Sequence, residues 1–141
     1  MKLRKHRAEL KLFPAHAPLD YVAIDILGPL IQSKDGYKYI LVISDRFSKL
    51  TGTVPLETVN EKTVAQAFLN HWAFVYGPPR VLLTDNGKQF VSKFFREVCR
   101  VIGTNNLYTT TYNAKCNGQV ERFNRTVLNL LRTYVGEHPR D

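Results

Sequence analysis

Three acidic residues have surroundings and spacing that suit metal-dependent chemistry on phosphate esters: Asp25, Asp85 and Glu121. Asp25 lies inside a strongly apolar run, where an unpaired carboxylate is costly and needs a cation or hydrogen-bond donors. Three carboxylates that converge repel one another, but two Mg²⁺ ions about 3.5–4 Å apart would neutralise them and hold a phosphodiester. Oxygen-only ligands favour Mg²⁺, with Mn²⁺ as a substitute, over zinc. Together the three acids predict a magnesium-dependent site.

Each acid alone also fits a simpler structural role. Asp25 would be satisfied by a nearby arginine or by backbone amides. Asp85 opens an Asp-Asn-Gly triplet, which is good turn chemistry. Glu121 stands four residues before Arg125, and such an exposed helical pair contributes only a few tenths of a kcal/mol. The metal site is favoured over these roles only if the fold brings all three acids together.

The first half of the chain predicts three strands joined by short turns. Apolar and β-branched runs cover residues 19–27, 37–43 and 50–56. Asp35-Gly36 suits the turn between the first two runs, and sequential strands with short connections predict an antiparallel meander. Pro55 cannot donate a hydrogen bond to a neighbouring strand, so it belongs at a sheet edge or at a strand end.

The second half alternates helices with short strands. Helices are predicted at residues 61–76, 90–102 and 119–135, and strands at 80–84 and 107–111. The apolar stripes of the three helices are Val64, Phe68, Trp72 and Val75; Phe94, Phe95, Val98 and Ile102; and Val120, Phe123, Val127, Leu131 and Tyr134. The aromatic residues predicted to lie in the core are Phe68, Trp72, Phe94, Phe95 and Phe123. This alternation predicts an α/β fold in which helices cover a mixed sheet.

Composition narrows the class of protein. The chain has 141 residues, which suits one compact domain, and its net charge of +8 favours a polyanionic partner such as nucleic acid. No apolar run approaches the ~20 residues of a membrane helix, and no secretory signal is evident, so we expect a soluble protein in a reducing compartment. Cys99 and Cys116 are then expected to be free thiols. Neither has a Cys or His partner at zinc-ligand spacing, so no zinc site is predicted.

Five ordered segments make the pattern specific. They read DILGP (25–29), SDRFSK (44–49), YGPP (76–79), TDNGKQF (84–90) and NGQVERFNR (117–125). Thirty-five residues separate Asp85 from Glu121, which is the spacing of the D,D-35-E pattern. From about residue 19 to residue 135, the chain resembles the integrase catalytic core of gypsy-class LTR retrotransposons and, more broadly, of retroviral-type integrases.

The resemblance implies an RNase H-like fold: a five-stranded mixed sheet, made of an antiparallel three-strand meander and two further strands, flanked by helices. It gives catalytic and metal-ligand roles to Asp25, Asp85 and Glu121. The implied function is metal-dependent processing of DNA 3′ ends, followed by strand transfer of those ends into target DNA. The implied partners are element-end and target DNA, together with further copies of the chain in a homodimer or higher multimer. A DNA substrate implies residence in the nucleus.

Polar and basic residues lie on or just before the predicted Glu121 helix: Lys115, Asn117, Gln119, Arg122, Asn124 and Arg125. They suit contacts with DNA phosphates or bases. Ordinary helix solvation, with Asn117 as an N-cap, explains them equally well. Residues 113–115 read Asn-Ala-Lys where the family commonly has a His-Pro-Gln-like stretch. This departure bears on DNA-end specificity and leaves the three acids untouched.

The predicted organisation is a basic N-terminal arm or linker at residues 1–18, the catalytic core at 19–136 and a truncated C-terminal end at 137–141. Residues 1–18 hold no counterpart of the zinc-binding domain that usually precedes this core, so we expect a fragment with partial activity. The main alternative is an inactive or domesticated relic that binds DNA or a protein partner. A ribonuclease H or a DNA transposase is disfavoured by the 35-residue spacing and the final glutamate. A simple basic DNA-binding protein would bind independently of Mg²⁺.

Overall fold

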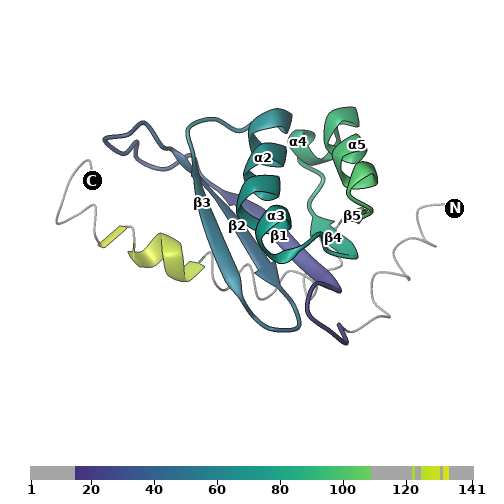
Figure 1. Ribbon diagram of the computed structural model, residues 1–141. Coiled ribbons are helices and arrows are strands. Elements are labelled where there is room, and N and C mark those ends of the chain that lie inside the picture. Colours follow the sequence, from purple (N-terminus) through teal and green to yellow (C-terminus); the bar gives the residue numbers. More distant parts are fainter. Residues whose placement is uncertain (1–14, 109–121, 123–124, 131, 134–141) are drawn as a thin grey trace, which may run out of the picture.

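Five strands form one mixed sheet in the computed structural model, which describes residues 15–108, 122, 125–130 and 132–133 (Figure 1). The strands are β1 (Tyr21–Leu27), β2 (Tyr39–Asp45), β3 (Thr51–Leu56), β4 (Val81–Thr84) and β5 (Asn105–Tyr108). Their order across the sheet is β3-β2-β1-β4-β5. The first three strands pair antiparallel, whereas β4 pairs parallel with both β1 and β5. The predicted five-stranded mixed sheet with its meander is confirmed.

The edge strand β3 carries Pro55, which lies opposite Ile40 of β2. An edge position tolerates the missing N–H of proline, so its predicted place is confirmed. The neighbouring strand β2 runs two residues beyond its apolar run. Ser44 there pairs with Thr51 in the strand register, and their hydroxyls form a 3.1 Å hydrogen bond. Polar cross-strand pairing thus extended a strand that hydrophobicity alone ended at residue 43.

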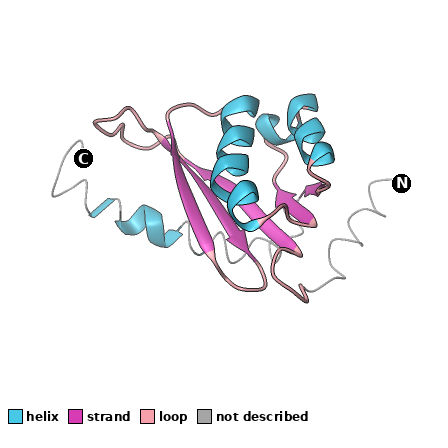
Figure 2. Ribbon diagram, viewed as in Figure 1, coloured by secondary structure: helices cyan, strands magenta, loops and turns pink. Residues whose placement is uncertain are grey.

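Helices cover one face of the sheet (Figure 2). They are α2 (Glu61–Phe68), the π-helical turn η1 (Leu69–Ala73), α3 (Phe74–Tyr76), α4 (Lys88–Val91) and α5 (Lys93–Val101). Between helices and sheet lies the larger apolar core, whose most completely buried members include Val22, Ile24, Leu41, Ile43, Phe68, Trp72, Leu82, Phe90 and Phe95. The predicted core positions of Phe68, Trp72 and Phe95 are confirmed. Phe123 lies outside the described residues.

The helix predicted at residues 61–76 forms, but its apolar stripe does not continue to Val75. The N–H of Phe74 donates to the carbonyl of Leu69, five residues earlier, so the η1 turn holds one residue more than an α-helical turn. This extra residue rotates the following side chains around the axis. Val75 is 62% exposed, and Tyr76 instead packs edge-to-face against Trp72 with 4.8 Å between the ring centroids. The predicted core position of Val75 is wrong.

The helix predicted at residues 90–102 is divided into α4 and α5. Ser92 lies between them with an extended backbone (φ −63°, ψ 151°), and its hydroxyl accepts the N–H of Phe95 as the N-cap of α5. Because α5 begins anew after Ser92, it turns a different set of side chains toward the sheet. Phe95 and Cys99 are buried, whereas Phe94 is 40% exposed. The predicted core position of Phe94 is therefore wrong.

The other face of the sheet carries a smaller apolar cluster: Tyr21, Ala23, Leu27, Val42, Val81 and Leu83. Val127 and Leu128 pack against it. Residues 122, 125–130 and 132–133 are helical, which confirms the predicted last helix over its described part. This helix therefore lies on the face opposite α2 and α5. β5 begins two residues before its predicted start, and residues 109–111 lie outside the described residues.

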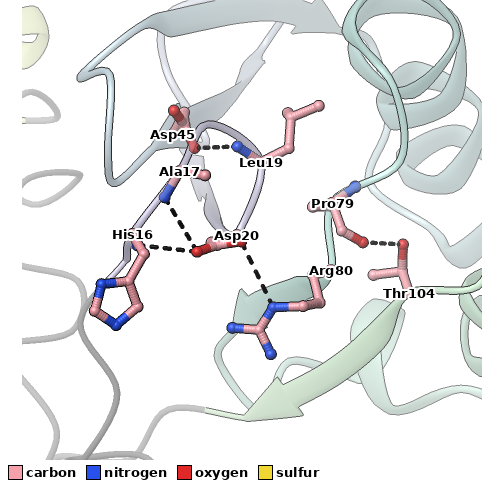
Figure 3. Close-up of polar contacts among 8 residues, drawn as sticks. All are labelled: His16, Ala17, Leu19, Asp20, Asp45, Pro79, Arg80 and Thr104. Atoms are coloured by element: carbon pink, nitrogen blue, oxygen red, sulfur yellow. Dashed lines mark hydrogen bonds and ion pairs between the residues drawn. The ribbon is translucent and has the colours of Figure 1, made fainter.

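The approach to β1 is held by Asp20 (Figure 3). Its Oδ2 accepts the backbone N–H groups of His16 and Ala17 at 2.9 and 3.1 Å, and its Oδ1 lies 3.7 Å from Nε of Arg80. The hydrogen bond from His16, together with that from Ala17 and the charge of Arg80, lowers the pKa of Asp20. These contacts tie the segment before β1 to the residue before β4.

Two further contacts in Figure 3 secure the same end of the sheet. The hydroxyl of Thr104 donates to the carbonyl of Pro79 at 2.6 Å, and buried Asp45 accepts the N–H of Leu19 at 3.1 Å. Asp45 also accepts the N–H and the hydroxyl of Ser48 at 2.9 and 2.6 Å, so its carboxylate is well supplied with donors. The starts of β1, β4 and β5 are thereby joined.

Cys99 is a free thiol within the core, and burial raises its pKa to about 11. The predicted free state of this cysteine is confirmed, and its raised pKa makes it a poor nucleophile. Cys116 lies outside the described residues. Within the described part of the chain, no helix combines the length and apolar character needed to cross a lipid bilayer.

Candidate active site

The pairing of β1 with β4 runs toward two of the three predicted acids. In the parallel register the last paired residues are Ala23 and Leu83. Asp25 and Asp85 each follow these residues by two positions. Because neighbouring strands are about 4.8 Å apart, we expect the two acids to lie near each other. Asp85 follows the last residue of β4, at the carboxyl end where ligands of α/β sheets gather.

Asp25 belongs to the face of the sheet that carries the smaller apolar cluster, because side chains alternate along a strand and Asp25 follows Ala23 by two residues. Asp85 follows Leu83, another member of this cluster, by two residues and lies just past the end of β4. The last helix packs on the same face. Glu121 lies outside the described residues, and the convergence of the three acids stays a prediction.

Asp25 is a half-buried carboxylate in the central strand of the sheet. Its Oδ1 accepts the N–H of the following residue, Ile26, at 2.8 Å. Its chain neighbours Ile24 and Ile26 pack in the larger core on the opposite face, so the backbone that carries Asp25 is fixed by apolar burial. The backbone-amide alternative for Asp25 is thus partly met.

Asp85 is exposed, and its Oδ1 accepts the N–H of Gly87 at 2.7 Å. This is the turn interaction that the Asp-Asn-Gly triplet predicts. Gly87 lies close to the carboxylate. A Cβ atom on Gly87 would be 2.9 Å from Oδ1 of Asp85 and 2.6 Å from Nε2 of Gln89. Glycine at this position therefore makes room for the Asp85 side chain.

Hydrogen bonds on both sides hold the segment that carries Asp85. Before it, the buried Thr84 shares a 3.2 Å hydrogen bond with the side chain of Asn106 on β5. After it, the carbonyl of Phe90 accepts the hydroxyl of Tyr108 at 3.2 Å. Arg96 of α5 donates to the same hydroxyl. The loop between β4 and α4 is thus anchored to β5 at both of its ends.

The donor chemistry of this site fits a hard divalent cation. Asp25 and Asp85 offer carboxylate oxygens, which Mg²⁺ and Mn²⁺ prefer. Within the described residues, no group of three or more His, Cys, Asp or Glu side chains is close enough to hold a metal ion. Two of the three predicted ligands lie in that part of the chain, and the third lies beyond it. The metal site formed by Asp25, Asp85 and Glu121 therefore stays a prediction.

The predicted DNA-contacting residues are only partly described. Arg122 and Arg125 lie on the last helix and are exposed. Thr126 donates its hydroxyl to the carbonyl of Arg122 at 3.1 Å. Lys115, Asn117, Gln119 and Asn124 lie outside the described residues. The interpretation of the whole strip as a DNA contact stays a prediction.

Sequence reasoning missed a groove beside Asp85. It has a volume of about 480 Å³ and is lined by Val59, Asn60, Glu61, Lys62, Lys88 and Gln89. These residues come from two segments, the start of α2 and the start of α4. The two helices contact each other in the fold. No motif links the two segments in the sequence, and only the packing of α4 against α2 shows that they form one surface.

Comparison with known proteins identifies the family. The integrase core domain family matches residues 15–114. The retrovirus-related Pol polyprotein from transposon 412 of Drosophila melanogaster is 29% identical over 128 residues, covering 91% of this chain and 10% of the polyprotein. The HTLV-2 integrase catalytic core domain in complex with magnesium has been solved in a trimeric form, with 26% identity, a TM-score of 0.69, and coverage of 91% of this chain and 79% of that one. Its dimeric form gives 26% identity, the same TM-score, and coverage of 89% and 79%.

These matches confirm the predicted resemblance and the RNase H-like fold. The chain spans only about a tenth of the length of the transposon 412 polyprotein. The family match itself covers well over half of the chain, and it includes Asp25, Asp85 and the strand pair that joins them. This protein therefore belongs to the integrase core domain family of retroviruses and retrotransposons.

Proposed function

We propose that this chain is a catalytic integrase core that cuts and rejoins DNA phosphodiesters in a metal-dependent reaction. The reaction comprises processing of DNA 3′ ends and transfer of those ends into a target strand. The observation that carries the proposal is the parallel pairing of β1 with β4, because Asp25 and Asp85 each follow by two residues the last paired residues, Ala23 and Leu83. The HTLV-2 relative, solved in complex with magnesium, supports the choice of metal.

Asp25, Asp85 and Glu121 are the proposed catalytic residues and would hold Mg²⁺ or Mn²⁺. When bound, the metal supplies charge neutralisation at the phosphodiester and activation of the attacking oxygen. The protein holds the carboxylates in their orientation. The N–H of Ile26 orients the carboxylate of Asp25, and the N–H of Gly87 orients that of Asp85. Arg122 and Arg125 would contact the DNA backbone near the Glu121 helix.

The native chain should nick and join labelled duplex DNA when Mg²⁺ or Mn²⁺ is present, and EDTA should abolish both reactions. The reason is that uncompensated carboxylates repel the phosphodiester when no cation lies between them. The products are separated by denaturing electrophoresis. If no product forms, calorimetric titration with Mn²⁺ distinguishes two cases. Metal binding without activity would show that other segments are required, whereas absence of both would contradict the proposal and favour a non-catalytic relic.

Gly87→Ala should lower the DNA-nicking rate about 10- to 100-fold while leaving the fold stable. The backbone of Gly87 (φ −57°, ψ 147°) is open to alanine without strain, but the new Cβ would displace the carboxylate of Asp85. A displacement of about 1 Å at a reacting centre commonly costs about 10²-fold in rate. Nicking rate and thermal midpoint are measured together.

Gly52→Ala is the matched control for this substitution. A Cβ on Gly52 would meet the Trp72 ring at an ordinary 3.7 Å, and Gly52 lies on the edge strand β3, which β2 and β1 separate from β4. Its nicking rate should equal that of the native chain. Equal rates for Gly87→Ala and Gly52→Ala would show that Gly87 makes no room that catalysis needs.

We further propose that this chain self-associates and that it binds DNA at the element ends and at the target site. We also propose that it acts in the nucleus. The HTLV-2 core relative has been solved in dimeric and trimeric forms. Here α3 presents Phe74, which is 70% exposed, beside the exposed Val75, and a second copy of the chain would cover them. Sedimentation velocity tests this part, because a chain that stays monomeric at high concentration contradicts it.

A further inference from the structure

Tyr108, the last residue of β5, carries a hydroxyl group at which three elements of the fold meet. The hydroxyl donates to the carbonyl of Phe90 on α4 at 3.2 Å. It accepts from Nε of Arg96 on α5 at 3.2 Å and from Nδ2 of Asn106 on β5 at 3.4 Å. The helices α4 and α5 contact each other, and α5 contacts β5 (Figure 1). One phenol oxygen therefore joins β5 to both helices.

A continuous chain of hydrogen bonds leads from this hydroxyl to the carboxylate of Asp85. The hydroxyl of Tyr108 holds the carbonyl of Phe90, and the N–H of Phe90 donates to the carbonyl of Gly87 at 2.9 Å. The N–H of Gly87 in turn donates to Oδ1 of Asp85 at 2.7 Å. The direction of the Asp85 carboxylate thus depends on where the peptide groups of Phe90 and Gly87 are held.

The short helix α4 needs this support from outside. It spans only four residues, and so short a helix is not stable through its own hydrogen bonds. The ring of Phe90 is 0% exposed and packs edge-to-face on Phe95, but apolar packing is non-directional and leaves the carbonyl to be oriented by a donor. Nδ2 of Asn106 lies 3.5 Å from that carbonyl, so the Tyr108 hydroxyl at 3.2 Å is the closer donor.

The ring and the hydroxyl of Tyr108 have separate roles. The ring packs against the larger apolar core, which is a contribution to stability that phenylalanine would preserve. The hydroxyl forms its hydrogen bonds with Phe90, Arg96 and Asn106. Removal of the hydroxyl alone therefore releases the carbonyl of Phe90 while it keeps the ring in the core.

We propose that Tyr108 is a positioning residue for the reaction at Asp85, because its hydroxyl fixes the Asp85 carboxylate through Phe90 and Gly87. The inference rests on the proposed function and adds a residue to the same site. Tyr108 acts through the loop and takes no part in the chemistry. Partners that orient metal ligands commonly contribute about 10- to 100-fold to metal affinity or activity. Since Tyr108 acts through two intervening residues, we expect an effect of about tenfold, at the lower end of that range.

The first measurement is amide hydrogen exchange by NMR on the full chain without metal or DNA. The N–H groups of Phe90 and Val91 both donate to the carbonyl of Gly87, so their exchange reports on the loop. In Tyr108→Phe these two amides should exchange about tenfold faster, which is the usual effect of losing one hydrogen bond. Amides of β2, such as that of Val42, should keep their native rates, whereas a general loss of stability would accelerate both sets.

The second measurement is metal-dependent nicking at several DNA concentrations. Tyr108→Phe should lower kcat about tenfold and leave the KM for duplex DNA unchanged, because a displaced Asp85 weakens the reaction rather than DNA binding. Tyr37→Phe is the matched control, since Tyr37 is an exposed tyrosine between β1 and β2 and loses the same hydroxyl group. It should keep the native exchange rates, kcat and KM.

Two results would overturn the positioning role. One is exchange at Phe90 and Val91 that equals that of Tyr37→Phe, or that accelerates no more than exchange in β2. The other is a kcat for Tyr108→Phe equal to that of Tyr37→Phe in a chain that cuts DNA. A native chain that does not cut DNA would count against the proposed function instead. The exchange rates would then still decide whether Tyr108 holds the Asp85 loop, because they are measured without metal or substrate.

Discussion

Asp85→Asn should lower the rate of metal-dependent DNA nicking by about 10³-fold or more. The substitution keeps the shape of the side chain and its turn, since the amide oxygen can still accept the N–H of Gly87. It removes the negative charge that would hold a divalent cation beside Asp25. Metal-assisted stabilisation of a phosphoryl transition state contributes several kcal/mol, and ~4 kcal/mol corresponds to about 10³-fold in rate. Single-turnover nicking assays with Mg²⁺ measure the loss.

Asp35→Asn is the matched control, because Asp35 is an exposed residue near the turn between β1 and β2. It loses the same charge and should keep the native rate. The nicking rate of Glu121→Gln should fall as far as that of Asp85→Asn if the third acid completes the site. A rate for Asp85→Asn within a factor of three of the control, under conditions where EDTA stops the native reaction, would remove Asp85 from the catalytic set.

Trp72→Ala should lower the free energy of unfolding by roughly 3–5 kcal/mol. The Trp72 side chain is only 1% exposed, packs edge-to-face on Tyr76 and lies over Gly52 of β3. Alanine does not fill the space that the indole ring occupies between η1 and the sheet, so truncation leaves a cavity. A domain of ordinary stability has only about 5–15 kcal/mol in total. Urea unfolding followed by circular dichroism measures the change.

The substitution Trp72→Phe distinguishes the contribution of side-chain packing to the free energy of unfolding from that of hydrogen bonding. The indole N–H is buried and has no acceptor within the described residues, so its removal sacrifices no hydrogen bond there. We expect a loss of roughly 1–2 kcal/mol, from lost ring volume alone. A loss for Trp72→Phe as large as that for Trp72→Ala would contradict this account, since it would mean that the N–H has an essential partner.

Much of the fold could be predicted because local pattern and burial agree in this chain. The apolar run around Asp25 predicts a central strand, and Pro55 predicts an edge, as the structure shows. Asp25 and Asp85 were selected as candidate ligands from their spacing and the family resemblance. The register of the strands that lead to them could not be read from composition, because it depends on how β4 is aligned along β1 after a long helical crossover.

The failures share one physical cause. Val75 and Phe94 were assigned to the core by assuming uninterrupted α-helical periodicity. One extra residue in η1 and one extended residue, Ser92, rotate the side chains that follow. Such interruptions are favoured by tertiary packing and leave little trace in hydrophobic pattern. The groove at Lys62 and Lys88 escaped prediction for a related reason, because it exists only where two separate helices meet.

The parallel register of β1 and β4 also constrains how this domain can vary in length. Insertions in the excursion between β1 and β2, at about residues 28–38, would leave the pairing of β1 with β4 unchanged, because they lie outside both strands. A single residue gained or lost inside β4 would instead turn Asp85 toward the helical face, since side chains alternate along a strand. We therefore expect the segment between β1 and β2 to tolerate insertions, whereas β4 should not tolerate the gain or loss of a single residue.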